Sequence, residues 1–216
     1  MKRDAIINGI SMGSLGWLRE SISFPPVQSQ TETTTVPGRN SPIRFSVVNN
    51  RISYQPRTFQ IVLTILADRE RFMSKVSELS QYFAGVLSEV IISEFPDLYA
   101  FGTLQLECSY DVQTHKGSVT ISCKDADSFL YYKDPTVVKV TGTQTVILKN
   151  DFMPVVPEIQ CSADTHLEWF IGTDQFDKDL TKGTWTLPEL ELRQKENSVK
   201  IITDGEVTFT YREGCL

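Results

Sequence analysis

The sequence has few cysteines and histidines for a chain of 216 residues. The four cysteines are Cys108, Cys123, Cys161 and Cys215, and no two of them have the spacing of a CxxC motif. There are two histidines, His115 and His166. Such a sparse set does not build the disulfide framework of small secreted domains, and it offers no ligand set for a structural zinc site. We therefore expect reduced thiols and neither a metal ion nor a cofactor.

The chain also lacks long apolar runs and an excess of positive charge. No apolar run approaches the roughly 18 residues that a transmembrane helix needs, and the first residues have no apolar core of signal-peptide length. The formal net charge is −6, whereas a general nucleic-acid binder needs a basic face to neutralise phosphates. These features predict a protein made in the cytoplasm that neither enters a membrane nor binds DNA specifically.

Residues that could catalyse a reaction or bind a metal ion occur without their usual partners. His115 is expected at a hairpin tip and His166 in a polar turn, and neither has a nearby nucleophile with an orienting third group. An acidic cluster lacks the central glycine and closing glutamate of a calcium loop, so a solvated loop is favoured over a metal site. The cluster consists of Asp164, Glu168, Asp174, Asp177 and Asp179. The sequence thus predicts no enzyme active site.

The most distinctive segment of the chain is SQTETTTVPGRNSPIRFS, residues 29–46. Its threonines favour extended backbone, because β-branched side chains fit a pleated surface. Val36, Pro37 and Gly38 then predict a turn, and Arg39 and Asn40 follow it before an alternating strand pattern opens at Ile43. This is either an ordinary surface hairpin or an arm that reaches a neighbouring molecule. We designate Val36, Pro37, Gly38, Arg39 and Asn40 as candidate assembly residues.

Residues 58–87 combine one strand and the only convincing helix. Apolar side chains alternate from Phe59 to Ile65, which predicts a half-buried strand. Asp68 is a plausible N-cap, because its carboxylate can accept hydrogen bonds from free amides of the first turn. The helix is expected over about residues 68–87, broken or closed near Gly85, and its apolar stripe should cover one face of a sheet. The stripe comprises Phe72, Met73, Val76, Leu79, Tyr82, Phe83 and Val86.

A hairpin is predicted over residues 104–123. Apolar residues have even numbers before the turn and odd numbers after it, so paired residue numbers should sum to an odd value. A loop of residues 114–117, closed by a left-handed Gly117, satisfies this rule. The resulting register pairs Cys108 with Cys123.

A second domain is expected after Asp134-Pro135. The chain then reads as short strands separated by turns, and Asp204-Gly205 is a strong hairpin signal. This pattern suggests a small β-sandwich. Trp169 and Trp185 are candidate glycan contacts, although their alternating neighbours fit a place in the core equally well. A protein interface, where tryptophan is enriched, is the third alternative.

Several segments in this order and spacing resemble the distal tail protein (Dit) family of long-tailed phages and related prophage elements. The resemblance covers most of the chain and is carried by residues 8–26, by the VPGR turn, by residues 57–85 and by the ending YREG-x-L. It implies a mainly β fold. Residues 1–133 would form an N-terminal β-sandwich-like domain with one helix, and residues 134–216 a galectin-like β-sandwich.

The same resemblance implies a structural role in the virion. The protein would form a homohexameric ring, joining the tail tube protein to the tail-tip or baseplate hub, and DNA would pass through the lumen without specific binding. A ring is physically compatible with an extended arm, since cyclic assemblies repeat one heterologous interface. The alternatives are a carbohydrate-binding sandwich that contacts a host-surface glycan and, less favoured, an enzyme.

Overall fold

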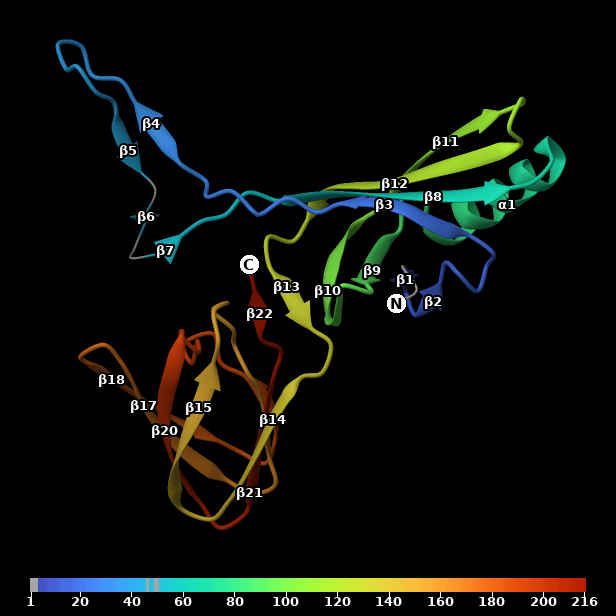
Figure 1. Ribbon diagram of the computed structural model, residues 1–216. Coiled ribbons are helices and arrows are strands. Elements are labelled where there is room, and N and C mark those ends of the chain that lie inside the picture. Colours follow the sequence, from blue (N-terminus) through green and yellow to red (C-terminus); the bar gives the residue numbers. More distant parts are fainter. Residues whose placement is uncertain (1–3, 46, 49–50) are drawn as a thin grey trace. The chain divides into compact units, whose positions relative to one another are not determined.

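The computed structural model describes residues 4–45, 47–48 and 51–216 (Figure 1). Its contacts divide the chain into two compact units, Met1–Leu130 with Leu216 and Tyr131–Cys215. The fold is mainly β, as the sequence predicts, with a single helix among the described residues. Whether each domain folds alone, with the expected boundary between residues 133 and 134, stays a prediction.

Two antiparallel sheets form the body of the first unit. One has the order β2-β1-β9-β10 and the other the order β11-β12-β8-β3. The strands of the first are β1 (Ala5–Ile7), β2 (Ile10–Ser11), β9 (Leu87–Ile92) and β10 (Phe95–Thr103). The strands of the second are β3 (Leu18–Ser23), β8 (Arg57–Leu66), β11 (Gln105–Asp111) and β12 (Lys116–Ala126).

Strand β8 is the central element of this unit, and its alternation is confirmed. Phe59, Ile61 and Leu63 are at most 2% exposed, whereas Thr58 and Gln60 are exposed. Helix α1 (Arg69–Phe83) and the β2-β1-β9-β10 sheet lie on the same side of the sheet that contains β8 (Figure 1). The apolar side chains of β8 therefore point into the core, and neither the helix nor the other sheet covers the opposite face of the sheet that contains β8.

Helix α1 begins as predicted but ends earlier. Asp68 is the N-cap, and its Oδ1 accepts a hydrogen bond of 2.8 Å from the Arg71 amide. The helix ends at Phe83 instead of near residue 87, because Gly85 has a φ of +72° and its amide donates to the carbonyl of Leu104. Of the expected stripe, Phe72, Leu79 and Phe83 are buried, while Met73, Tyr82 and Val86 are exposed.

The register predicted for the hairpin β11–β12 is wrong. Cys108 lies opposite Val119, not Cys123, and the loop comprises residues 112–115. The left-handed residue is His115, with a φ of +52°, and the Asp111 carboxylate accepts hydrogen bonds from the Gln113 amide and the Thr114 hydroxyl. These bonds, the one from Thr114 foremost, lower the pKa of Asp111. The rule that paired numbers sum to an odd value does hold, because side chains alternate.

Gly117 serves packing and not the turn. It lies within β12, and a Cβ atom built on it would approach Phe72 Cδ2 to 2.1 Å. The Phe72 ring stacks on Tyr110 and meets Trp17 edge-on. A residue with a side chain at position 117 would therefore collide with the helix that covers the sheet.

The four cysteines are free. Cys108 is exposed at the edge strand β11, while Cys123 is buried and Gly102 of β10 leaves room for its sulfur. Burial raises the pKa of the Cys123 thiol to about 11. This thiol is consequently protonated and unreactive near neutral pH.

The second unit is a β-sandwich of two antiparallel sheets, β14-β21-β16-β19 and β15-β20-β17-β18. One contains β14 (Thr136–Thr141), β16 (Glu158–Cys161), β19 (Gly183–Thr186) and β21 (Glu206–Tyr211). The other contains β15 (Gln144–Asn150), β17 (Thr165–Ile171), β18 (Asp174–Leu180) and β20 (Lys195–Thr203). The short strands β13 (Leu130–Tyr132) and β22 (Gly214–Cys215) flank the sandwich in sequence.

The predicted hairpin at Asp204-Gly205 is wrong. The chain crosses there from one sheet to the other, since β20 pairs with β15 and β17 while β21 pairs with β14 and β16. Gly205 is required because a Cβ atom would meet Ser162 Oγ at 2.5 Å. Strands β20 and β21 are therefore adjacent in sequence but lie in different sheets, on either side of the sandwich core.

Candidate functional site

A long two-stranded arm leaves the first unit between β3 and β8. Strands β4 (Glu32–Thr34) and β5 (Ile43–Phe45) pair antiparallel, with Thr34 opposite Ile43, and β6 (Val47–Val48) pairs with β7 (Arg51–Ile52). Every residue from 28 to 42 is exposed. The arm projects from the end of the sheet that is opposite helix α1 (Figure 1). Little apolar area is buried to hold its outer part in place.

The turn at the tip of the arm has the predicted conformation. The Arg39 amide donates to the Val36 carbonyl over 3.1 Å, and Gly38 has a φ of +82°. Proline at the second position and glycine at the third are characteristic of a type II turn. The turn thus presents Val36, Pro37, Arg39 and Asn40 to solvent.

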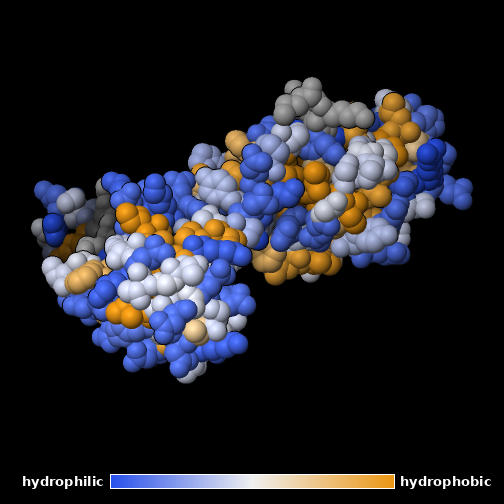
Figure 2. Space-filling view, turned by 90° about the horizontal axis from the view of Figure 1, so that it is seen from below, coloured by the Kyte–Doolittle hydropathy of each residue, from blue (hydrophilic) through white to orange (hydrophobic). Residues whose placement is uncertain are grey.

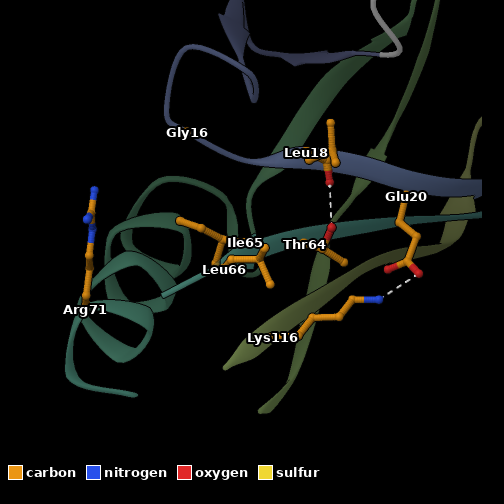
Figure 3. A pocket seen from close by; sticks show the side chains of 8 residues that line it. All are labelled: Gly16, Leu18, Glu20, Thr64, Ile65, Leu66, Arg71 and Lys116. Carbon is orange, nitrogen blue, oxygen red and sulfur yellow. Dashed lines mark hydrogen bonds and ion pairs between the residues drawn. The ribbon is translucent and has the colours of Figure 1, made fainter. Parts of the chain in front are cut away.

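An open pocket of about 650 Å³ lies at the other end of the first unit, beside helix α1. Its lining residues are Gly16, Leu18, Glu20, Thr64, Ile65, Leu66, Arg71 and Lys116. In Figure 3 Arg71 lies on one side, the ion pair between Lys116 and Glu20 on the other, and Ile65 and Leu66 between them. The pocket is therefore an apolar depression with charged margins.

Two leucines make this depression unusual for a soluble protein. Leu18 is 67% exposed and Leu66 is 77% exposed. Figure 2 shows that apolar residues form separate patches among polar ones on one face of the molecule. Clustered exposed apolar side chains mark interaction surfaces more often than isolated ones do. From the sequence, Leu66 was expected at the end of a strand, but no pattern indicated that Leu18 would line the same pocket.

The two histidines belong to different units and have separate surroundings. Tyr110 donates to the Ala67 carbonyl, and its hydroxyl lies 3.2 Å from His115 Nδ1 at the predicted hairpin tip. His166 lies on β17 and not in a turn, with its Nδ1 2.6 Å from Asp179 Oδ1 on β18. Within the described part of the chain, no group of three or more His, Cys, Asp or Glu residues could hold a metal ion.

The acidic cluster is distributed over strands and is not the solvated loop that we expected. Glu168 lies on β17, and its carboxylate pairs with Lys200 over 2.9 Å. Asp174, Asp177 and Asp179 lie on β18. Asp164 precedes β17 and accepts a hydrogen bond from the Lys182 amide. Glu168 and Asp179 both lie beside His166, whose Nε2 is 3.7 Å from Glu168 Oε1, while Asp164, Asp174 and Asp177 are spaced along the chain.

The two candidate glycan contacts have different surroundings. Trp169 is 4% exposed, stacks on Phe176 and donates to the Glu189 carbonyl, so it belongs to the sandwich core. Trp185 is 37% exposed at the edge strand β19 and donates to the Thr181 carbonyl over 2.9 Å. It lies opposite buried Ile159, so its ring borders the core at the sheet edge. Trp185 is the one of the pair that a ligand can reach.

No helix within the described part of the chain is both long and apolar enough to span a membrane. A scan against models of protein families finds no match, and a search of curated proteins finds none either.

A comparison with solved structures does find a similar fold. The chain is similar to the Dit protein (gp 19.1) of phage SPP1, with a TM-score of 0.72 and 12% sequence identity. The match covers 99% of this chain and 99% of that protein. The SPP1 protein is described as a paradigm of the hub adsorption apparatus in phages that infect Gram-positive bacteria. The two chains therefore share one fold over their whole lengths.

Proposed function

We propose that the protein is a structural, non-enzymatic component of a phage or prophage tail tip, in which it forms a homohexameric ring. The observation that carries this proposal is the whole-length likeness to SPP1 Dit, which includes both units and leaves no additional domain unmatched. The ring would join the tail tube protein to the tail-tip or baseplate hub. An acidic subunit, with a net charge of −6, is compatible with passage of DNA through the lumen without specific binding.

Two different surfaces at opposite ends of the first unit suit a head-to-tail interface. Strand β8 begins beside the base of the arm at Arg57 and ends beside the pocket at Leu66. Its ten residues span about 30 Å at ~3.3 Å per residue. An arm on one end and an apolar depression on the other fit a heterologous contact, the type of interface that builds a ring when the rotation between successive copies closes.

We assign the arm tip of a second copy to the pocket beside helix α1. The tip offers exposed apolar Val36 and Pro37, which match the exposed leucines of the pocket. Glu32 at the start of β4 complements Arg71, and Arg39 at the tip would compete with Lys116 for the Glu20 carboxylate. Pairing of the free arm edge with a strand of the neighbour would add backbone hydrogen bonds.

Native mass spectrometry of the intact chain tests the proposed ring. We expect a species of six subunits, each of 24.4 kDa. The fragment of residues 1–133 should still form a ring, because it contains the arm, the pocket and the core around β8. A full-length ring together with a strictly monomeric fragment would show that the second unit supplies the interface.

Trp185, which is 37% exposed, favours one alternative, a glycan-binding sandwich. Of the three tryptophans, all in the described residues, Trp17 and Trp169 are each 4% exposed, so fluorescence quenching by a ligand reports mainly on Trp185. For a tail-tip component that does not bind sugars through this edge, host-wall glycans should leave the emission unchanged. Quenching that saturates, and that disappears in Trp185→Phe but not in Trp169→Phe, would instead support the glycan function.

A further inference from the structure

Three segments of the first unit meet at the base of the arm on one buried arginine. Arg57 is 4% exposed. Its Nη1 donates to the carbonyl of Pro25, where the chain enters the arm. Its Nε and Nη2 donate to the carbonyl of Ser128, over 3.3 and 3.2 Å. Ser128 lies shortly before Tyr131, the first residue of the second unit.

Aromatic side chains fix the plane of this guanidinium. The Arg57 Cζ atom lies 5.2 Å from the centroid of the Phe24 ring. Phe24 stacks in turn on Phe59, with 5.3 Å between centroids, and Phe59 is 2% exposed. Because a stacked guanidinium presents its donors in a rigid fork, Arg57 holds both carbonyls in one fixed arrangement.

The outgoing side of the arm is tied to the same short segment. The Ser128 hydroxyl donates to the Gln55 carbonyl over 2.8 Å, and the Phe129 ring meets the Tyr54 ring edge-on at 5.7 Å. Between the two sides, the Gln55 amide donates to the Gln28 carbonyl and the Gln30 amide to the Ser53 carbonyl. The outgoing side of the arm is thus fastened directly to Ser128 and Phe129, and the incoming side is fastened to them through Arg57 and through its backbone bonds to the outgoing side.

We propose that Arg57 is a positioning residue that fixes the direction of the arm and couples it to Ser128 and Phe129. We call these two residues the junction, because they lie near the end of the first unit in the sequence. This inference rests on the proposed function in so far as the arm takes part in assembly. An arm held in its bound direction loses less conformational entropy when a neighbour captures it. By linkage, capture of the arm stabilises the junction, and a loosened junction weakens capture by the same factor.

Hydrogen exchange on the unassembled subunit tests the coupling. In Arg57→Lys, a single ammonium replaces the stacked fork, so the amides of Gln30 and Gln55 should exchange at least tenfold faster, while amides of helix α1 keep their wild-type rates. Ser128→Ala removes only the hydroxyl. Ser128→Ala should accelerate exchange at the Gln55 amide by a smaller factor than Arg57→Lys does. If Arg57→Lys folds poorly, Ser128→Ala still tests the coupling.

Arg19→Lys is a matched control. Arg19 is also 4% exposed, and it binds the Glu94 carboxylate with both terminal nitrogens. That contact lies away from the arm, so this variant should leave Gln30 and Gln55 unchanged. Unaltered rates at Gln30 and Gln55 in Arg57→Lys, or equal acceleration of every amide, would overturn the coupling.

Assembly provides the second readout. The subunit concentration at which half of the protein is assembled should rise at least tenfold in Arg57→Lys. It should rise less in Arg19→Lys, when the two variants have the same thermal stability. A wild-type chain that never assembles would refute the proposed function, whereas the exchange rates would still decide the role of Arg57. Accelerated exchange at the arm base combined with unchanged assembly would show that Arg57 holds the arm and would refute the dependence of assembly on the arm's direction.

Discussion

The double variant Gly38→Val with Arg39→Ala is expected to remain monomeric under conditions in which the wild-type chain forms a ring. Gly38 has a φ of +82°, and a β-branched residue is strained there by about 1–2 kcal/mol. The tip should therefore change its conformation, and Arg39 would no longer offer a guanidinium to the neighbour. Together these losses should weaken assembly by at least ~10-fold, which corresponds to about 1.4 kcal/mol per contact.

The stability of the isolated subunit should hardly change in this variant. The arm tip is exposed and contributes little to either core, so it can relieve the strain at position 38 by changing its own conformation without unfolding either unit. Thermal melting of the subunit and sedimentation at several concentrations measure the two quantities separately. A matched control is Gly172→Val with Lys178→Ala, since Gly172 also has a positive φ in an exposed turn of the second unit.

Mixing experiments can identify the surface that receives the arm. Leu66→Glu should also be monomeric, because it places a charge in the pocket beside helix α1. When the arm variant and the pocket variant are mixed, one intact arm and one intact pocket remain, and the expected product is a one-to-one dimer that cannot close. Two monomers in the mixture would show that the arm binds elsewhere. A loss of subunit stability in the arm variant, with assembly of the folded fraction intact, would identify the segment as a local hairpin.

Gly117→Val is expected to destabilise the first unit strongly. A Cβ atom at this position would lie 2.1 Å from Phe72 Cδ2, and Phe72 is 1% exposed between Tyr110 and Trp17. Overpacking of a core costs about 1–3 kcal/mol and occasionally more. For a domain of roughly 100 residues, each kcal/mol lowers the melting temperature by about 4–8 °C.

Ser109→Val is the control for this substitution. Ser109 is exposed on the neighbouring strand β11, so valine there adds the same side chain without a collision. Phe72→Leu combined with Gly117→Val should recover part of the loss, because the two sites share the contact. Equal melting temperatures for Gly117→Val and Ser109→Val would mean that helix α1 can move away from the sheet at little cost.

The features that could be predicted from the sequence are those set by residues close together along the chain. The alternation of β8, the N-cap at Asp68 and the turn at Gly38 are all present in the structure. Each of them depends on side-chain periodicity or on backbone preferences within a few residues, and no distant part of the chain opposes them. The role of the arm residues in assembly remains to be tested by the variants above.

The hairpin register and the path at Asp204-Gly205 depended on more distant residues. In the first case the Phe72 ring fills the space above Gly117, so the loop lies at residues 112–115 and Cys108 lies opposite Val119. In the second case the sequence did contain a signal. Buried residues have odd numbers in both β20 and β21, whereas a two-residue hairpin would pair odd with even numbers and place the two apolar sets on opposite faces.

By itself, the sequence determined a mainly β chain with one capped helix, an exposed arm with a rigid turn, and a strand-rich second part. Only the tertiary structure decided which strands pair, that Leu18 and Leu66 meet at one pocket, and that Arg57 binds both Pro25 and Ser128. The physical reason is that local preferences fix the conformation of a segment. Register and juxtaposition, in contrast, are set by close packing between segments that are far apart in the chain.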